Sequence, residues 1–165
     1  MVIQSDIFDK ETNELKAKLY TTLFIRGIGG FGSKGFYKND IPEDQSTPPQ
    51  HEVQCTTEPN QAVLYRLNGD YNPLHIDPAM SELGGFKTPI LHGLCTYGIS
   101  ARAIFETYHK EDPQLLQSVS ARFTSHVFPG ETLIVAMWKE GNKVVFQTRT
   151  KERGLVVCKG SCVIK

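Results

Sequence analysis

The sequence has no excess of charge of either sign, because 18 Lys and Arg balance 18 Asp and Glu. Surfaces that bind nucleic acid or anionic membranes usually carry an excess of basic residues. We therefore expect no nucleic acid and no membrane among the partners of this chain. An anionic ligand would have to be met by local charges.

Long apolar runs are absent too. No segment approaches the roughly 18 apolar residues of a membrane span, and the N-terminus MVIQSDIFDKE lacks the basic and apolar regions of a signal peptide. These absences predict an intracellular protein. The 165 residues, 39% of them hydrophobic, suffice for one buried core.

Cysteines are few and form no CxxC pair, which argues against a zinc cluster and against a disulfide framework. We expect reduced thiols in the core and no bound metal. The four residues are Cys55, Cys95, Cys158 and Cys162.

The first fifty residues are expected to hold a strand followed by a long loop. Residues 15–25 are rich in Leu, Tyr, Thr and Ile, which favours a strand. Residues 27–50 are rich in Gly and Pro and predict a long loop. Gly27 to Gly32 match the GxGxxG pattern, but no helix follows to receive a pyrophosphate, so a dinucleotide site is not expected.

The remainder predicts an α+β domain over residues 51–165. After an extended stretch at 52–57, a helix should start at Pro59-Asn60, with Val63, Leu64 and Leu67 on one face. Pro73 must end it in a sharp turn, since proline disfavours a helical residue before it.

A short helix is expected at 78–83, with Asp77 as its cap, and a long buried helix at 93–108. Four alternating segments follow, which we expect to form an antiparallel meander around that helix. The candidates for burial in the long helix are Leu94, Ile99, Ala103 and Ile104.

The segment YRLNGDYNPLHIDPA places a carboxylate, Asp70, and an imidazole, His75, on either side of an Asn-Pro turn. Such a turn lets both groups converge on a small volume, where they can hold a water and exchange protons with it. The free N–H groups at the start of the long helix, at His92-Gly93, would stabilise negative charge on a carbonyl oxygen. Together these groups suit the addition of water to an unsaturated thioester.

The runs GDYNPLHIDPA and GFKTPILHGLCTYG resemble the MaoC-like dehydratases, most closely hydratase 2, the R-specific unit of peroxisomal multifunctional enzymes. The resemblance covers roughly residues 50–165. It implies a hot-dog fold, an antiparallel sheet wrapped around a long helix. It also implies reversible hydration of trans-2-enoyl-CoA to (3R)-3-hydroxyacyl-CoA in fatty-acid β-oxidation.

The resemblance assigns roles to individual residues. Asp70 and His75 would activate the water, and the N–H of Gly93 would receive the thioester oxygen. No metal and no redox cofactor is implied, since the CoA thioester is the substrate. The substrate-binding residues it implies are Asp70, Tyr71, Asn72, Pro73, Leu74, His75, Gly93 and Phe123.

The family's eukaryotic members carry two hot-dog repeats. By this resemblance, residues 1–50 are the last strand and linker of a first repeat, and residues 51–165 are the catalytic repeat. Either the chain is a fragment, or it pairs with another copy, and we expect a homodimer. The resemblance implies a peroxisomal location, although the chain ends in Val163-Ile164-Lys165 and not in a Ser-Lys-Leu signal. Without such a signal the alternative is the cytoplasm.

Other interpretations stay open at this point. A hot-dog thioesterase or an acyl-carrier dehydratase would share the fold, and a non-catalytic acyl-CoA-binding half would need neither Asp70 nor His75. We favour packing or a backbone hydrogen bond over chemistry for His92. Ordinary, solvated or non-ligating positions are expected for His51, His109 and His126, and for the scattered Arg102, Arg122, Lys139, Lys151 and Lys159.

Overall fold

A computed structural model describes residues 1–23, 25, 27–30, 32, 46–108 and 112–165. The chain divides into two compact units, Met1–Asn39 and Asp40–Lys165. Most of the loop expected at 27–50, part of the GxGxxG run and His109 lie outside the described residues.

The first unit is a β-hairpin of β1 (Val2–Phe8) and β2 (Leu15–Thr22). Its turn is fixed by the Asp9 carboxylate, which accepts the N–H groups of Glu11 and Thr12. The strand expected at 15–25 ends earlier, at Thr22, and β1 was not expected at all. Every residue of both strands is exposed within the chain, and a lone two-stranded hairpin is marginal in water.

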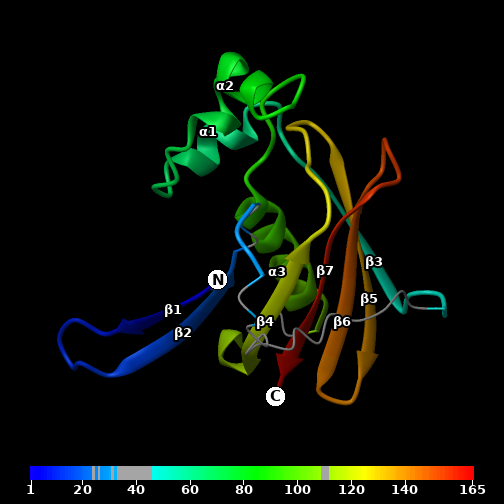
Figure 1. Cartoon of the computed structure of the whole chain (residues 1–165). Helices are drawn as coiled ribbons and strands as arrows, with labels where there is room; N and C mark the ends of the chain where they lie inside the picture. The colour runs from blue at the N-terminus through cyan, green and yellow to red at the C-terminus, as the bar shows by residue number, and fades with distance from the viewer. Residues whose placement is uncertain (24, 26, 31, 33–45, 109–111) are drawn as a thin grey trace. The chain divides into compact units, whose positions relative to one another are not determined.

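The second unit is built on a five-stranded antiparallel sheet in the order β3-β5-β6-β7-β4 (Figure 1). Its strands are β3 (His51–Thr56), β4 (Leu116–Phe123), β5 (Thr132–Glu140), β6 (Lys143–Thr150) and β7 (Val156–Ile164). The four predicted C-terminal strands are therefore confirmed.

The predicted meander is correct only for β5, β6 and β7. The strand β4 does not pair with the next strand in sequence, β5. It pairs with β7 and is itself the edge strand on that side of the sheet. Gly141 and Asn142 make a tight hairpin between β5 and β6, whereas the eight residues 124–131 between β4 and β5 form a structured loop. That length allows the chain to cross to a non-adjacent position, which alternation alone does not reveal.

The helix α3 (Gly93–Tyr108) packs against all five strands of this sheet, so the expected central helix is confirmed with its bounds. Ala103 and Ile104 of this helix are buried in the same core cluster as Phe146 of β6. The hydroxyls of Ser100 and Thr148, both buried, hydrogen-bond at 2.7 Å and join the helix to β6. Ile99 is half-buried, but Leu94 is 59% exposed, so its expected burial is wrong.

Short helices connect β3 to α3: α1 (Gln61–Arg66), the 3-10 turn η1 (Pro73–His75) and α2 (Pro78–Leu83). A second 3-10 turn, η2 (Pro113–Leu115), precedes β4. The Asp77 carboxylate accepts the Ala79 N–H at 2.8 Å, which confirms it as the cap of α2.

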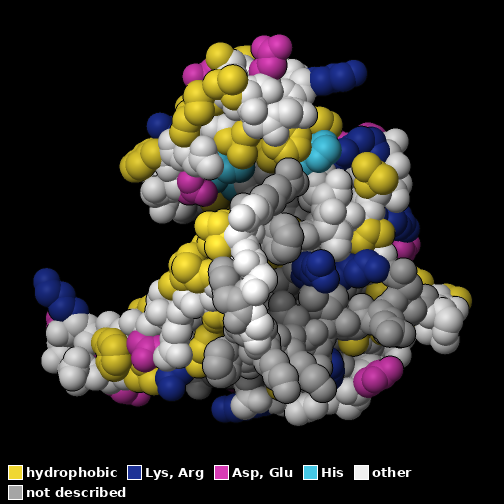
Figure 2. All heavy atoms as spheres, in the orientation of Figure 1, with side chains coloured by type: hydrophobic (Ala, Val, Ile, Leu, Met, Phe, Trp, Pro, Cys, Tyr) yellow, Lys and Arg dark blue, Asp and Glu magenta, His cyan; other side chains and the backbone are white. Residues whose placement is uncertain are grey.

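The apolar face expected on the helix at Pro59-Asn60 is exposed in the single chain. Val63, Leu64 and Leu67 are at least 49% exposed, and the buried residue of α1 is Ala62. Figure 2 shows apolar side chains over the region of α1 and α2, with histidine side chains at its base. An apolar helix face exposed in a single chain indicates a contact surface.

All four cysteines are free thiols, and three of them are buried, as expected. Burial raises the pKa of Cys158 to about 12 and that of Cys95 to about 11. Among the described residues, no helix combines the length and apolar character that crossing a membrane requires.

Candidate active site

The segment after α1 is forced off the helix by its own residues. Gly69 has a φ of +106°, which favours glycine, and Pro73 starts η1 with its fixed φ. Asn72 lies between them at φ −57° and ψ 119°, and its side chain accepts the Leu74 N–H at 3.1 Å. The Asp70 carboxylate accepts the Asn72 N–H at 3.2 Å. These local bonds fix the conformation of the turn that carries Asp70. The sequence predicted this turn from Pro73.

His75, at the end of η1, is 9% exposed and is oriented by one backbone group. Its Nδ1 lies 2.8 Å from the carbonyl oxygen of Ile90. A carbonyl oxygen only accepts, so Nδ1 must carry a proton. In the neutral ring Nε2 is then the basic nitrogen, free to take a proton from water.

His92 lies directly against His75. The two imidazole rings are stacked with centroids 3.7 Å apart, and His92 is 1% exposed. Its Nε2 lies 3.3 Å from the backbone carbonyl oxygen of Asp70, and its ring also faces Tyr65 at 4.7 Å. The expected backbone hydrogen bond of His92 is thus present, but the stacking on His75 was not expected.

Asp70, His75 and His92 each offer one side-chain atom within 4.8 Å of the others, which raises the question of a metal. A metal ion lies close to the plane of each imidazole that ligates it. The two rings are stacked face to face, 3.7 Å apart and inclined by 28°, and do not converge edge-on toward a common point, so this arrangement does not favour one ion shared in both ring planes. The cluster is better suited to holding a water beside a carboxylate and an imidazole.

Gly93 follows His92 and begins α3, where the first N–H groups have no helical acceptor. A Cβ built on Gly93 would lie 3.4 Å from the Phe123 ring, which therefore covers this residue closely. Phe123 is 45% exposed at the end of β4. Thus the fold brings Phe123 to the start of α3, although 30 positions separate it from Gly93.

Tyr71 and Leu74 lie at the border of the site. Tyr71 is 64% exposed, and the guanidinium of Arg66 lies 4.8 Å above its ring. The Leu74 side chain points to Gly84, where its Cδ1 would meet an added Cβ at 2.9 Å.

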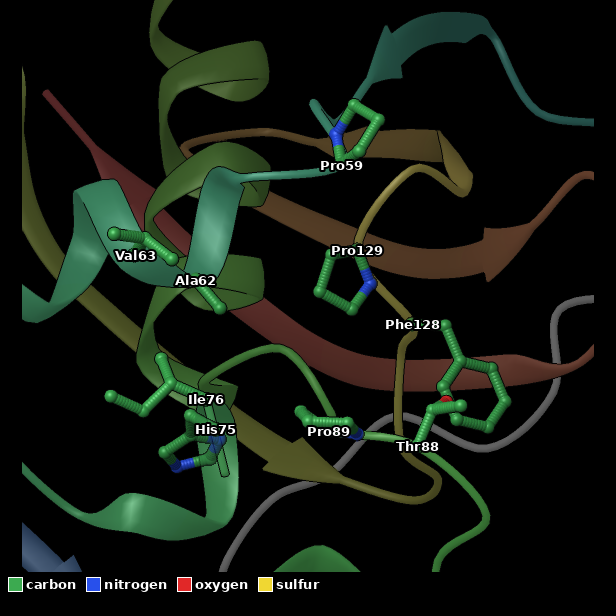
Figure 3. Close-up of a pocket in the computed structure, with 9 residues that line it drawn as sticks. All are labelled: Pro59, Ala62, Val63, His75, Ile76, Thr88, Pro89, Phe128 and Pro129. Carbon is green, nitrogen blue, oxygen red and sulfur yellow. The ribbon is translucent and has the colours of Figure 1, made fainter. Parts of the chain in front are cut away.

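His75 also lines a cleft of about 370 Å³ (Figure 3). Its walls are largely apolar and come from α1, from the segment before α3 and from the loop between β4 and β5. Of the predicted site residues that the structure describes, only His75 lines it. The lining residues are Pro59, Ala62, Val63, His75, Ile76, Thr88, Pro89, Phe128 and Pro129.

An antiparallel sheet wrapped around one long helix defines the hot-dog class of protein, and in this chain a carboxylate and an imidazole lie close together beside the start of that helix. A crystal structure of a MaoC-like dehydratase from Phytophthora capsici matches with a TM-score of 0.93 and 42% identity. That match covers 99% of this chain and 56% of the other, and it confirms the hot-dog fold.

Residues 41–160 match the family model described as MaoC like domain, and the chain belongs to this family. The peroxisomal enoyl-CoA hydratase 2 of Arabidopsis thaliana is 44% identical over 167 residues, 96% of this chain. The peroxisomal hydratase-dehydrogenase-epimerase of Neurospora crassa is 47% identical over 164 residues, 93% of this chain. The chain spans 54% of the first relative and 17% of the second.

Proposed function

We propose that this chain catalyses the reversible addition of water to trans-2-enoyl-CoA, giving (3R)-3-hydroxyacyl-CoA, in fatty-acid β-oxidation. The observation that carries the proposal is the convergence of Asp70 and His75 on one small volume next to the start of α3. The family and the hydratase 2 relative support it.

In this reaction a water is held between the Asp70 carboxylate and Nε2 of His75. One of these two groups takes a proton from the water, and the water oxygen bonds to C3 of the enoyl group. The π electrons of C2=C3 move toward the thioester carbonyl, and C2 then receives a proton from the site. Water adds as H and OH, so the atoms balance and no oxidant is needed.

The negative charge that develops on the thioester oxygen needs a donor. We propose the N–H of Gly93, aided by the dipole of α3. Phe123, packed on Gly93, would hold the substrate against this donor, with Tyr71, Asn72, Pro73 and the backbone of Leu74 along the other side. A metal or a redox group is not required for any of these steps.

The test follows the ultraviolet absorbance of crotonyl-CoA and of a long-chain trans-2-enoyl-CoA after addition of the folded protein. The C3 configuration of the product is read with R- and S-specific dehydrogenases. We expect loss of the enoyl signal, R product, and the same rate with and without a chelator. Release of free CoA thiol would indicate a thioesterase instead, and an unchanged signal with both substrates would refute the proposal.

We also propose that the active form is a homodimer. The strands β3 and β4 are edges of the sheet, and the apolar residues of α1 are exposed in the single chain. A second hot-dog unit would cover such surfaces. Light scattering should give twice the 18.5 kDa chain mass, and a mass of one chain would contradict this.

We propose a peroxisomal location, because the relatives from Neurospora crassa and Arabidopsis thaliana are named as peroxisomal enzymes. A fluorescent fusion of the full natural protein should then coincide with a peroxisomal marker. Diffuse cytoplasmic fluorescence would contradict it.

A further inference from the structure

The histidine beside the proposed catalytic pair has no role in the reaction described above, yet it contacts both of its members. His92 stacks on the His75 ring at 3.7 Å and bonds to the backbone of Asp70 at 3.3 Å. It also immediately precedes Gly93, and its own carbonyl accepts the N–H groups of Cys95 and Thr96 in the first turn of α3.

We propose that His92 is a positioning residue that fixes His75, the Asp70 segment and the start of α3 relative to one another. This inference rests on the proposed hydration reaction. The stacked ring restricts rotation of the His75 side chain, and the N–H bond restricts the backbone that carries the Asp70 carboxylate. His92 is joined to Gly93 by one peptide bond. Its two contacts therefore fix His75 and the Asp70 backbone relative to the proposed oxyanion donor, the Gly93 N–H.

The role needs an uncharged ring with its proton on Nε2. The partner of Nε2 is a carbonyl oxygen, so Nε2 must donate. Burial lowers the pKa of His92 most, the neighbouring His75 lowers it further, and Arg66 adds a smaller effect in the same direction. The bond to the Asp70 backbone and the Asp70 carboxylate oppose this, but the net direction is downward, which favours the neutral ring.

Packing alone does not account for a histidine here. Nδ1 of His92 is buried and has no hydrogen-bond partner among the described residues. A buried polar atom without a partner costs free energy that an apolar side chain of similar size would avoid. A phenylalanine would keep the stacking without that cost, but it would lose the N–H that binds the Asp70 backbone.

The experiment compares two variants that each remove one contact. His92→Phe keeps an aromatic ring against His75 and loses the N–H donor, whereas His92→Gln keeps a donor and loses the ring. We expect kcat for crotonyl-CoA to fall about tenfold or more in both, with KM within about threefold, since small misplacements of catalytic groups cost this much. His126→Phe, a partly buried histidine outside the site, is the control and should leave kcat within about twofold of wild type.

A double-mutant cycle separates positioning from an independent action. If His92 acts through His75, His92→Phe should lower kcat far less in a His75→Ala background than in wild type. An undiminished effect, or kcat within about threefold of wild type in both single variants, would overturn the proposal.

A second measurement uses the wild-type protein, so it does not depend on whether a variant folds. Two-bond ¹H–¹⁵N spectra should show neutral rings protonated at Nε2 for His92 and at Nδ1 for His75, and a His92 protonated at Nδ1 would overturn the proposal. The spectra are informative even if no hydration is found. Inactive wild type would refute the proposed function, whereas active wild type with insensitive His92 variants would refute only this inference.

Discussion

Gly160 of β7 is the position where one added carbon should do most damage. It pairs with Ala121 of β4 on one side and with Phe146 of β6 on the other. A Cβ at Gly160 would lie 2.1 Å from the carbonyl oxygen of Ser120 and 2.7 Å from the Phe146 ring. Real Cβ contacts are not found below 3.0 Å, so the edge strand β4 would have to move by about 0.9 Å, the difference between 3.0 and 2.1 Å.

We expect Gly160→Ala to lower the free energy of unfolding by about 3 kcal/mol, the upper end for overpacking, because the obstacle is backbone and not a flexible side chain. For a chain of this size, Tm should fall by about 6–12 °C. Urea unfolding followed by circular dichroism measures the first quantity and a thermal scan the second. Since β4 ends at Phe123, which covers Gly93, hydration of crotonyl-CoA should weaken as well.

Gly98→Ala is the matched control. Gly98 lies inside α3 with no atom within 4 Å of an added Cβ, so alanine should stabilise the helix by up to about 1 kcal/mol. If Gly160→Ala unfolds within about 0.5 kcal/mol of wild type, the packing of β4 on β7 described above is wrong.

Two further predictions concern titration. The pKa values of His92 and His126 are both lowered, chiefly by burial, so the unfolded chain binds protons more readily than the folded one. Stability should therefore be full above the ordinary histidine pKa of about 6.5 and decline below it, before the carboxylates titrate; urea midpoints at pH 7.5, 6.5 and 5.5 measure this, and a flat or rising series would contradict it. The raised pKa values of Cys158 and Cys95, about 12 and about 11, predict that these thiols resist iodoacetamide at pH 8 until the protein unfolds; rapid labelling of both in folded protein, read by mass spectrometry, would refute it.

Elements with strong local signals could be predicted from the sequence. The run of apolar residues at 93–108 gave α3, and the glycine and asparagine at 141 and 142 gave the β5–β6 hairpin. The turn that carries Asp70 followed from the constraint that Pro73 places on the residue before it. These predictions held because each depends on residues a few positions apart.

Features that depend on distant partners could not be predicted. The pairing of β4 with β7 is decided by how the loop at 124–131 crosses the sheet, which no local pattern encodes. The exposure of Leu94 was missed because an apolar pattern predicts burial without saying whether the partner lies in the same chain.

The site shows the same limit. The spacing of Asp70 and His75, with the family resemblance, pointed to the pair. The Ile90 carbonyl that orients His75 has no side-chain signal, because any residue at that position supplies a carbonyl. His92 was noticed in the sequence, but its stacking on His75 requires two segments 17 positions apart to meet face to face.

The most direct test of the account is the kcat/KM of Asp70→Asn with crotonyl-CoA, measured beside Asp77→Asn. Both changes remove one carboxylate charge, but within the described part of the chain the Asp77 carboxylate bonds only to N–H groups in the first turn of α2, and asparagine caps as well. We predict that Asp70→Asn lowers kcat/KM by at least about 100-fold, as expected when an acid-base group is removed, and leaves its Tm unchanged. Asp77→Asn should keep near-wild-type activity. Activity of Asp70→Asn within a few-fold of wild type would contradict the central claim.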